Sequence, residues 1–273
     1  MNLSICAPTR QYKNRNTCFS LDSLKKIARG YNNKVADGNK IEITDDVNKL
    51  HKSIHKKMNK LCSGEVCWTE QEFVRELDDE NINYLTFKPE RPAGKKQWLS
   101  TTDIRKVMVQ YEKKFPDFVF LGPVPIDFDE IQTEISTINL KQLQQKGVNK
   151  LGIIFNLDEH YKSGSHWVGL YMEFSDKRSE IDYFDSYGDP PEARIERLID
   201  RLIDNAKSYL NMNLTKNINR IRTQFANSEC GVYSMNFILH LIMGDSFKTT
   251  TEDIIRDAEM NNRRNLFFRS NSS

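Results

Sequence analysis

The sequence contains no run of about 18 consecutive apolar residues, the length that a membrane-spanning helix requires. Its first residues, MNLSICAPTRQYKNRN, also lack the apolar segment of a secretory signal peptide. No internal repeat or low-complexity tract stands out. With 273 residues, of which 29% are charged and 10% aromatic, the composition is typical of a soluble globular protein of one or two domains. We therefore expect no membrane partner.

Cysteine is scarce, with five residues at positions 6, 18, 62, 67 and 230. An odd number without a signal peptide predicts free thiols in a reducing compartment. Cys6, Cys18, Cys62 and Cys67 are four possible zinc ligands, but eleven residues separate the first two and four separate the last two. Zinc knuckles usually separate their paired cysteines by two residues, so we expect no metal. Nothing else in the sequence calls for a cofactor.

The net charge of +2 conceals an uneven distribution. Residues 1–60 carry 13 Lys and Arg against 5 Asp and Glu, a net +8, so the remaining residues sum to −6. Such a basic segment can attract nucleic acid or an acidic partner, or it can be the solvated face of helices. No nucleic-acid-binding motif accompanies it, which favours the solvated face.

The first part of the chain has the apolar spacing of helices. Residues 20–31 and 45–62 each place apolar side chains on one helical face. A third helix is predicted over residues 69–80, where Thr69 followed by Glu72 matches a capping box. These segments predict a mostly helical N-terminal arm.

A change of pattern follows the segment KPERPAGKK, residues 88–96, whose two prolines and one glycine indicate a linker. We therefore divide the chain into a helical arm, residues 1–94, and a second domain, residues 95–273. Short runs of β-branched and aromatic residues predict strands in this domain, and amphipathic or apolar segments predict helices. The strands are expected at 118–122, 151–157, 166–174 and 179–188, and the helices at 100–115, 192–211 and 230–244. Helices packed on a small sheet make this domain α+β.

Two of these strands are joined by the four residues SDKR, the length of a hairpin loop. If Phe174 pairs with Ser179, then Val168 pairs with Asp185. Alternation along the strand places His166 on the face of Val168, so His166 and Asp185 become diagonal neighbours. Diagonal positions lie about 7–8 Å apart at Cα, close enough for their side chains to form a hydrogen bond.

This imidazole–carboxylate pair has a candidate nucleophile in Cys230. The cysteine is predicted at the start of an apolar helix, where the helix dipole and a nearby imidazole favour the thiolate. Asp185 would orient His166 and stabilise its charged form. Gln224, six residues before the cysteine, offers a side-chain donor for an oxyanion hole, and Gly231 leaves space for a substrate backbone.

The order His-Trp, Asp, Gln-x5-Cys-Gly resembles the ubiquitin-like-protein-specific cysteine proteases. This family includes the SUMO proteases, the adenovirus protease and the polyprotein proteases of large nucleocytoplasmic DNA viruses. The matching positions are His166-Trp167, Asp185, Gln224 and Cys230-Gly231. The segment QWLSTTDI, residues 97–104, is similar to the entry helix of the family, and the resemblance extends from about residue 95 to 245. It implies a papain-like, adenain-like α+β domain, with a small mixed sheet flanked by helices.

The resemblance also implies substrate-binding roles. Two tryptophans of SUMO proteases clamp a Gly-Gly substrate end, and the matching residues are Trp98 and Trp167. Flat aromatic walls would select glycine because they exclude side chains. Asn156, in the strand before the His166 loop, is part of the same match. It could orient the histidine or the substrate, or it could cap a turn, as asparagines at strand edges commonly do. Ser100-Thr101 replaces the Asn-Asp of the family, which removes an acidic contact toward SUMO.

Residues 62–71 and 118–128 are similar to the giant-virus branch of the family, which includes the African swine fever virus polyprotein protease. The resemblance thus implies a thiol endopeptidase that cuts viral structural polyproteins after Gly-Gly-type sites, in the virion and the host cytoplasm. The main alternative is an isopeptidase that removes SUMO or ubiquitin-like proteins from host proteins. An inactive module that binds ubiquitin-like tails and an acyltransferase are further alternatives. By analogy with the adenovirus enzyme, the basic arm is a candidate to bind nucleic acid.

Overall fold

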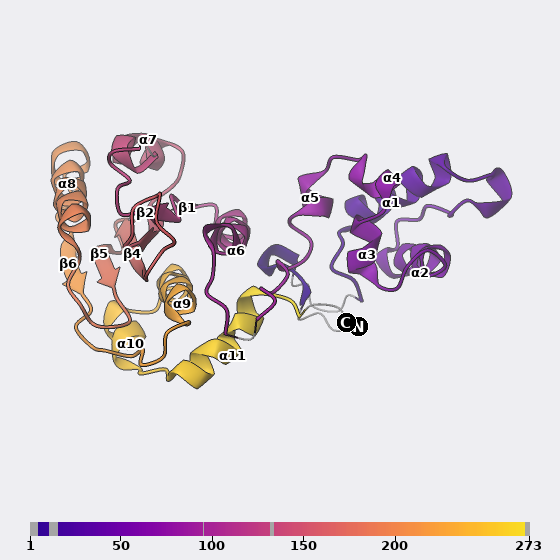
Figure 1. Ribbon diagram of the computed structural model, residues 1–273. Helices are drawn as coiled ribbons and strands as arrows, with labels where there is room; N and C mark the ends of the chain where they lie inside the picture. The colour runs from indigo at the N-terminus through magenta and orange to yellow at the C-terminus, as the bar shows by residue number, and fades with distance from the viewer. Residues whose placement is uncertain (1–4, 11–15, 95, 132–133, 271–273) are drawn as a thin grey trace. The chain divides into compact units, whose positions relative to one another are not determined.

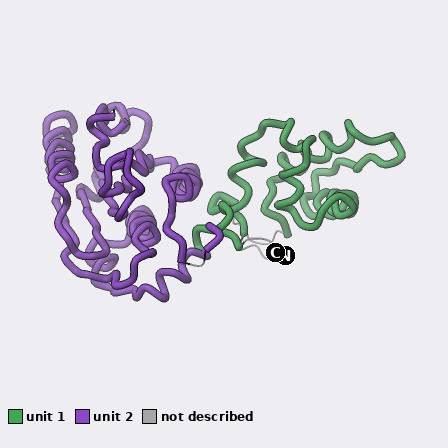
Figure 2. The backbone as a smooth tube through the Cα atoms, viewed as in Figure 1, with its two compact units in different colours: residues 1–91, 266–273 green, residues 92–265 purple. Residues whose placement is uncertain are grey.

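The structure is a computed structural model that describes residues 5–10, 16–94, 96–131 and 134–270. The chain forms two compact units, which are coloured separately in Figure 2. The smaller unit comprises residues 1–91 and 266–273, and the larger unit comprises residues 92–265. The predicted boundary at residue 95 lies next to the first division. The grouping of residues 266–273 with the N-terminal residues was not predicted. Within the described residues, no helix has both the length and the apolarity needed to cross a membrane.

The smaller unit is helical, as predicted. The predicted helices at 20–31 and 45–62 are confirmed as α1 (Leu21–Asn33) and α2 (Val47–Met58). Their apolar faces form a core with the buried Trp68 ring. Three short helices complete the main part of the unit: α3 (Glu65–Thr69), α4 (Glu72–Arg75) and α5 (Glu80–Asn83), with 3-10 turns η2 (Pro8–Arg10) and η3 (Asp37–Asn39).

One helix start predicted in this unit is wrong. Thr69 does not cap a long helix, because it is the last residue of α3. Its hydroxyl donates to the carbonyl of Val66 in the preceding turn, which is 2.7 Å away. The predicted single helix over 69–80 is therefore three short segments, and Glu72 begins α4 rather than completing a capping box.

The cysteines of the smaller unit also differ from the prediction. Cys6 and Cys18 form one disulfide, and Cys62 and Cys67 form a second. The Cα separations of 5.3 and 6.0 Å lie in the usual range for a disulfide. The expectation of free thiols is wrong for these four residues, because it rested on their number and not on their proximity. Cys230 is a free thiol, as expected.

The larger unit is built on a mixed six-stranded sheet (Figure 1). The strand order is β1–β3–β4–β5–β6, and the two-residue β2 also pairs with β3. Strand β3 is antiparallel to β4 and β4 to β5, while the outer pairings are parallel. The bounds are β1 (Phe118–Phe120), β2 (Val124–Pro125), β3 (Lys150–Asn156), β4 (Trp167–Phe174), β5 (Ser179–Phe184) and β6 (Thr215–Ile218). The predicted strands are thus present, and β2 and β6 are additional.

The hairpin register predicted for β4 and β5 is confirmed. Phe174 pairs with Ser179, and four residues form the loop between them. The last ladder pair before the strands separate is Gly169 with Phe184. His166 and Asp185 therefore follow at the same end of the hairpin.

Helices cover both faces of the sheet, which makes the α+β prediction correct. Helix α8 (Ala193–Leu210) buries its apolar stripe against one face, where Ile153, Leu170 and Ile181 project. Helix α9 (Cys230–Ile242) lies on the opposite face, as Figure 1 shows, and contacts β3, β4 and α6. The remaining helices of the unit are α6 (Thr101–Lys114), α7 (Leu140–Gln145), α10 (Phe247–Glu252) and α11 (Asp257–Phe267), whose last residues belong to the smaller unit, with the 3-10 turn η4 (Glu134–Thr137).

Two glycines on the sheet allow α9 to pack closely. A Cβ at Gly152 would lie 2.9 Å from the Phe118 ring and 3.1 Å from the Ile238 side chain. A Cβ at Gly169 would lie 3.3 Å from the Phe237 ring. Real Cβ contacts are rarely this short, so larger residues at either position would push α9 away from the sheet.

We predict that Gly152→Val lowers the free energy of unfolding by about 1–3 kcal/mol, because overpacking forces α9 and Phe118 apart. Urea unfolding followed by circular dichroism measures the change. Gly38→Val is the matched control: no atom lies within 4 Å of the added Cβ there, so its effect should stay within about 0.5 kcal/mol. Equal effects of the two substitutions would contradict the packing explanation.

Candidate active site

Cys230 is the first residue of α9 and is almost fully buried. The helix start is tied to the start of β4 by Ser234, whose hydroxyl lies 3.0 Å from the carbonyl of Cys230 and 3.1 Å from that of Trp167. Unpaired N–H groups of a helix N-terminus favour a negatively charged sulfur. The predicted location of the cysteine is therefore confirmed.

His166 and Asp185 meet as the hairpin register predicted. Nε2 of His166 lies 2.7 Å from Oδ1 of Asp185, and both side chains are buried. The Cys230 side chain lies close enough to the imidazole to raise its pKa. Because Nε2 is occupied by the carboxylate, Nδ1 is the ring nitrogen available to the thiol. The structure thus brings the three side chains together, with His166 between Cys230 and Asp185.

The surroundings of His166 stabilise its protonated form. Burial alone would lower the pKa of the imidazole, but hydrogen bonds and charge interactions with Asp185 and Cys230 outweigh it and raise the pKa to about 9. A histidine in water titrates near 6.5. At neutral pH the ring is therefore an imidazolium, which is suited to pair with a thiolate and to donate a proton.

Gln224 is fully buried on the loop that leads to α9. Its Oε1 accepts a hydrogen bond from the Ser186 hydroxyl at 2.7 Å, and its Nε2 donates to the carbonyl of Ala226 at 2.7 Å. These two partners define which end of the amide carries the N–H groups. One N–H of the amide remains for another acceptor, so the residue can act as an oxyanion donor.

Trp167 and Leu99 form a wall beside the helix start. The indole Nε1 donates to the carbonyl of Leu99 at 2.9 Å, which fixes the ring, and Trp98 next to it is 42% exposed. A Cβ at Gly231 would lie 3.3 Å from both Leu99 and Trp167. The glycine therefore has a packing role against this wall, which the sequence analysis did not anticipate.

Asn156 shapes the loop that ends at His166. Its Oδ1 accepts hydrogen bonds from the backbone N–H of Asp158 and of Ser165. The side chain therefore supports His166 through the loop backbone. Asn156 also lines an open pocket of about 370 Å³, together with Trp167, Leu99 and other residues of the loop. Within the described part of the chain, the predicted substrate-binding residues Asn156 and Trp167 thus border one pocket.

Sequence reasoning gave no role to two residues that support the site. The ring of Tyr187 stacks on the imidazole of His166, with centroids 4.3 Å apart and an interplanar angle of 4°. Ser186 orients the amide of Gln224, as described above. Both directly follow Asp185, and their proximity to a predicted site residue was the available signal.

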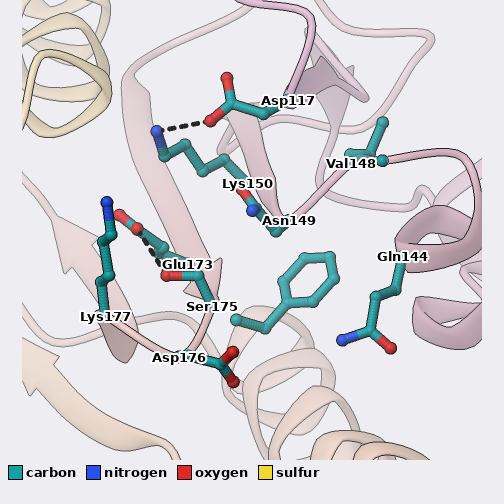
Figure 3. A pocket seen from close by; sticks show the side chains of 11 residues that line it. Asp117, Gln144, Val148, Asn149, Lys150, Glu173, Ser175, Asp176 and Lys177 are labelled. Carbon is teal, nitrogen blue, oxygen red and sulfur yellow. Dashed lines mark hydrogen bonds and ion pairs between the residues drawn. The ribbon is translucent and has the colours of Figure 1, made fainter.

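A second pocket, of about 400 Å³, lies at the other end of the sheet (Figure 3). Lys150, which pairs with Asp117, and Glu173, which accepts a hydrogen bond from Ser175, line it. Lys150 and Asn156 are the two ends of β3, so about 20 Å separates this pocket from the candidate site. None of the predicted site residues lines it.

Comparisons with known proteins agree with this geometry. A model of the Ulp1 protease family, C-terminal catalytic domain, matches residues 133–272. The chain is 34% identical over 289 residues to the putative thiol protease R355 of Acanthamoeba polyphaga mimivirus, which covers 99% of this chain and 95% of that protein. It is 24% identical over 196 residues to the SUMO-1 cysteine protease S273R of African swine fever virus (isolate Pig/Kenya/KEN-50/1950). This match covers 67% of this chain and 72% of that protein.

The fold is also found among solved structures. The crystal structure of the ASFV pS273R protease matches with a TM-score of 0.69 at 19% identity, covering 98% of this chain and 96% of that chain. This likeness confirms the predicted α+β cysteine protease fold with a helical N-terminal region. The family model and the mimivirus relative together settle the assignment. The chain belongs to the Ulp1 protease family and is a thiol protease.

Proposed function

We propose that Cys230 is the nucleophile of this protease, with His166 as its acid and base. The observation that carries the proposal is the buried group of Cys230, His166 and Asp185, in which the imidazole interacts with both the cysteine and the carboxylate. Asp185 holds the imidazole in place, and its Oδ1 is itself held by the backbone N–H of Tyr187 at 2.8 Å. A thiolate beside an imidazolium is the reactive form of a thiol protease.

The reaction then proceeds by acyl transfer. The thiolate attacks the carbonyl carbon of the substrate, and the resulting oxyanion accepts hydrogen bonds from Gln224 and from backbone N–H groups at the start of α9. The C–N bond breaks as His166 gives its proton to the departing amine. Water, deprotonated by His166, then attacks the acyl-enzyme and releases the thiolate.

The substrate proposed for this chemistry is a viral structural polyprotein, cut after Gly-Gly-type sequences. The fixed Trp167 ring and the partly exposed Trp98 support a narrow aromatic passage that excludes side chains. The viral origin of the relatives supports a viral substrate. The sequence match to the mimivirus protein and the structural match to the African swine fever virus protease both extend over nearly the whole chain, including the helical N-terminal region. The corresponding location is the virion and the host cytoplasm.

Deconjugation of a ubiquitin-like protein is the second candidate, since a relative is named a SUMO-1 cysteine protease. The start of α6 argues against SUMO as the substrate. Ser100 caps this helix, and the carboxylate of Asp103 accepts hydrogen bonds from the backbone N–H and hydroxyl of Ser100. Ser100-Thr101 lacks the acidic contact that the family uses toward SUMO, and the carboxylate of the nearby Asp103 is already engaged within the chain.

The pH dependence of kcat/KM tests the role of His166. Because its pKa is raised to about 9, the imidazolium is present below this pH, and we predict that activity falls as pH rises through about 9. Asp185→Asn removes a carboxylate that raises the pKa of His166. The alkaline limb of its pH profile, where kcat/KM falls, should therefore move to lower pH.

Asp182→Asn is the matched control, because Asp182 is another buried aspartate of the same strand region, with Asn217 as its partner. Its alkaline limb should stay near the wild-type position. An Asp185→Asn enzyme with an unchanged limb would show that Asp185 does not stabilise the imidazolium.

Mapping of cleavage sites tests the substrate. We predict that the protease cuts the structural proteins of its virus after Gly-Gly-type sequences, as mass spectrometry of the new termini would show. Cys230→Ala should lower the rate by about 10⁵-fold or more, because the nucleophile is absent. Rapid reaction of Cys230 with a SUMO or ubiquitin vinyl sulfone, without such cuts, would favour the deconjugating enzyme instead.

A lysine stripe on α2 favours the further proposal that the smaller unit binds nucleic acid. Lys49, Lys52 and Lys56 follow one another at helical spacing and are exposed. Within the described residues, no carboxylate lies within ion-pair distance of them, whereas Lys25 and Lys34 pair with Asp45 and Glu76. Part of the excess positive charge of the N-terminal region thus lies on this helix face.

We predict that replacing Lys49, Lys52 and Lys56 by Gln weakens binding to a fluorescent DNA duplex. The slope of log K against log salt should fall by about 2 to 3, because three phosphate contacts are lost. Fluorescence anisotropy over a salt series measures it. The control carries the same charge change at Lys25, Lys34 and Lys40, which are ion-paired, and should keep the slope. Equal loss in both variants would exclude the stripe as the binding surface.

A further inference from the structure

A stack of four side chains extends from the candidate base to the surface. The ring of Tyr187 covers the imidazole of His166, with 4.3 Å between their centroids. The guanidinium of Arg222 lies over Tyr187, with Cζ 5.2 Å from the ring centroid. It also lies over Phe225, with Cζ 5.1 Å from that centroid. Because the imidazole occupies one face of Tyr187, the guanidinium occupies the other.

This stack holds Arg222 in a fixed orientation. Two aromatic rings cover its planar faces, and Nε donates to the carbonyl of Gln224 at 3.0 Å. Arg222 is exposed nevertheless, and Phe225 is 71% exposed. A guanidinium restrained in this way loses little conformational entropy when its outer edge binds a partner.

The outer edge of Arg222 has no acidic partner within the described residues. Among the carboxylates nearby, Asp257 is already engaged: its Oδ2 accepts the backbone N–H groups of Phe225 and Ala226, and its Oδ1 accepts the hydroxyl of Tyr233. The two terminal nitrogens of Arg222 make no hydrogen bond or ion pair with any described residue. A free guanidinium edge is suited to a carboxylate, which it can bind through two parallel hydrogen bonds.

The position of Arg222 relates it to the leaving side of the substrate, the segment that follows the cleaved bond. His166 must reach the nitrogen of the departing amine to protonate it, so the segment that leaves runs past the imidazole. Tyr187 adjoins that imidazole, and Arg222 lies on the far face of the Tyr187 ring. Gly231, the residue after Cys230, packs against Trp167 and Leu99, where the proposed glycine passage lies.

From this geometry we infer that Arg222 determines specificity on the leaving side. It binds an Asp or Glu side chain within the first few residues after the cleaved bond. Phe225 and Tyr187 hold the guanidinium and offer apolar surface to the same segment. The inference deepens the proposed function, because it rests on Cys230 and His166 as the reacting pair.

The test is digestion of a proteome-derived peptide library by four full-length proteins: the wild type, Arg222→Gln, Arg222→Lys and Arg220→Gln. Mass spectrometry then gives the residues on both sides of every cut. We expect Asp and Glu to be enriched roughly 10-fold on the leaving side of wild-type cuts, the effect of one charge-assisted pair. In Arg222→Gln this enrichment should fall to about background, and in Arg222→Lys it should be intermediate, since Lys lacks the planar fork.

Arg220→Gln is the matched control, since Arg220 is exposed, lies two residues away and loses the same charge. Among the described residues it forms no cation–π contact of the kind that holds Arg222, so the acidic preference of this variant should remain. Enrichment compares sites cut by one variant, so a general loss of activity does not alter it. The inference is overturned if wild-type cuts show no acidic preference, if Arg222→Gln keeps it, or if Arg220→Gln loses it equally. The frequency of glycine on the acyl side of the same cuts separately tests the proposed cleavage after Gly-Gly-type sequences.

Discussion

The close contact between helix α9 and the sheet is the constraint on which the candidate site depends. Gly152 and Gly169 remove the side chains that would hold the helix away. Ser234 then joins the first turn of α9 to the start of β4 through two carbonyls. A nucleophile on a helix and a base on a strand can form a hydrogen bond only if the two elements are held at a fixed distance. The packing of the sheet face therefore decides the reactivity of Cys230.

The buried charges of the site are stable because the surrounding loops satisfy them. A buried ion pair with unsatisfied partners costs several kcal/mol, so each lone pair needs a donor. Asp185 accepts from His166 and from a backbone N–H, and Asn219 donates to the Asp185 carbonyl at 2.7 Å. Gln224 is held at both ends of its amide. The polar network thus fixes the geometry before any substrate binds.

The sequence was informative wherever local rules decide the structure. Period-two alternation and a four-residue loop were sufficient to pair Phe174 with Ser179, and from that register the meeting of His166 with Asp185 followed. The apolar run after Cys230 was sufficient to place it at a helix start. Such features depend on residues close in the sequence or on one hairpin.

Features that depend on distant segments were not predictable in the same way. Arg222 meets Tyr187 because the loop after β6 returns to the end of β5, and nothing in the local pattern encodes this approach. The disulfide between Cys6 and Cys18 depends on the path of the chain between them. The odd number of cysteines had instead predicted free thiols. The short helices α3 and α4 lack the length over which periodicity is recognisable.

The smaller unit is assembled from both ends of the described chain. Arg269 donates its backbone N–H to the Pro89 carbonyl, and its own carbonyl accepts the N–H of Arg91. Phe267 and Phe268 are buried. During synthesis, residues 266–269 leave the ribosome only after residues 92–265 have emerged. The smaller unit therefore receives its last segment only after the whole of the larger unit has been synthesised.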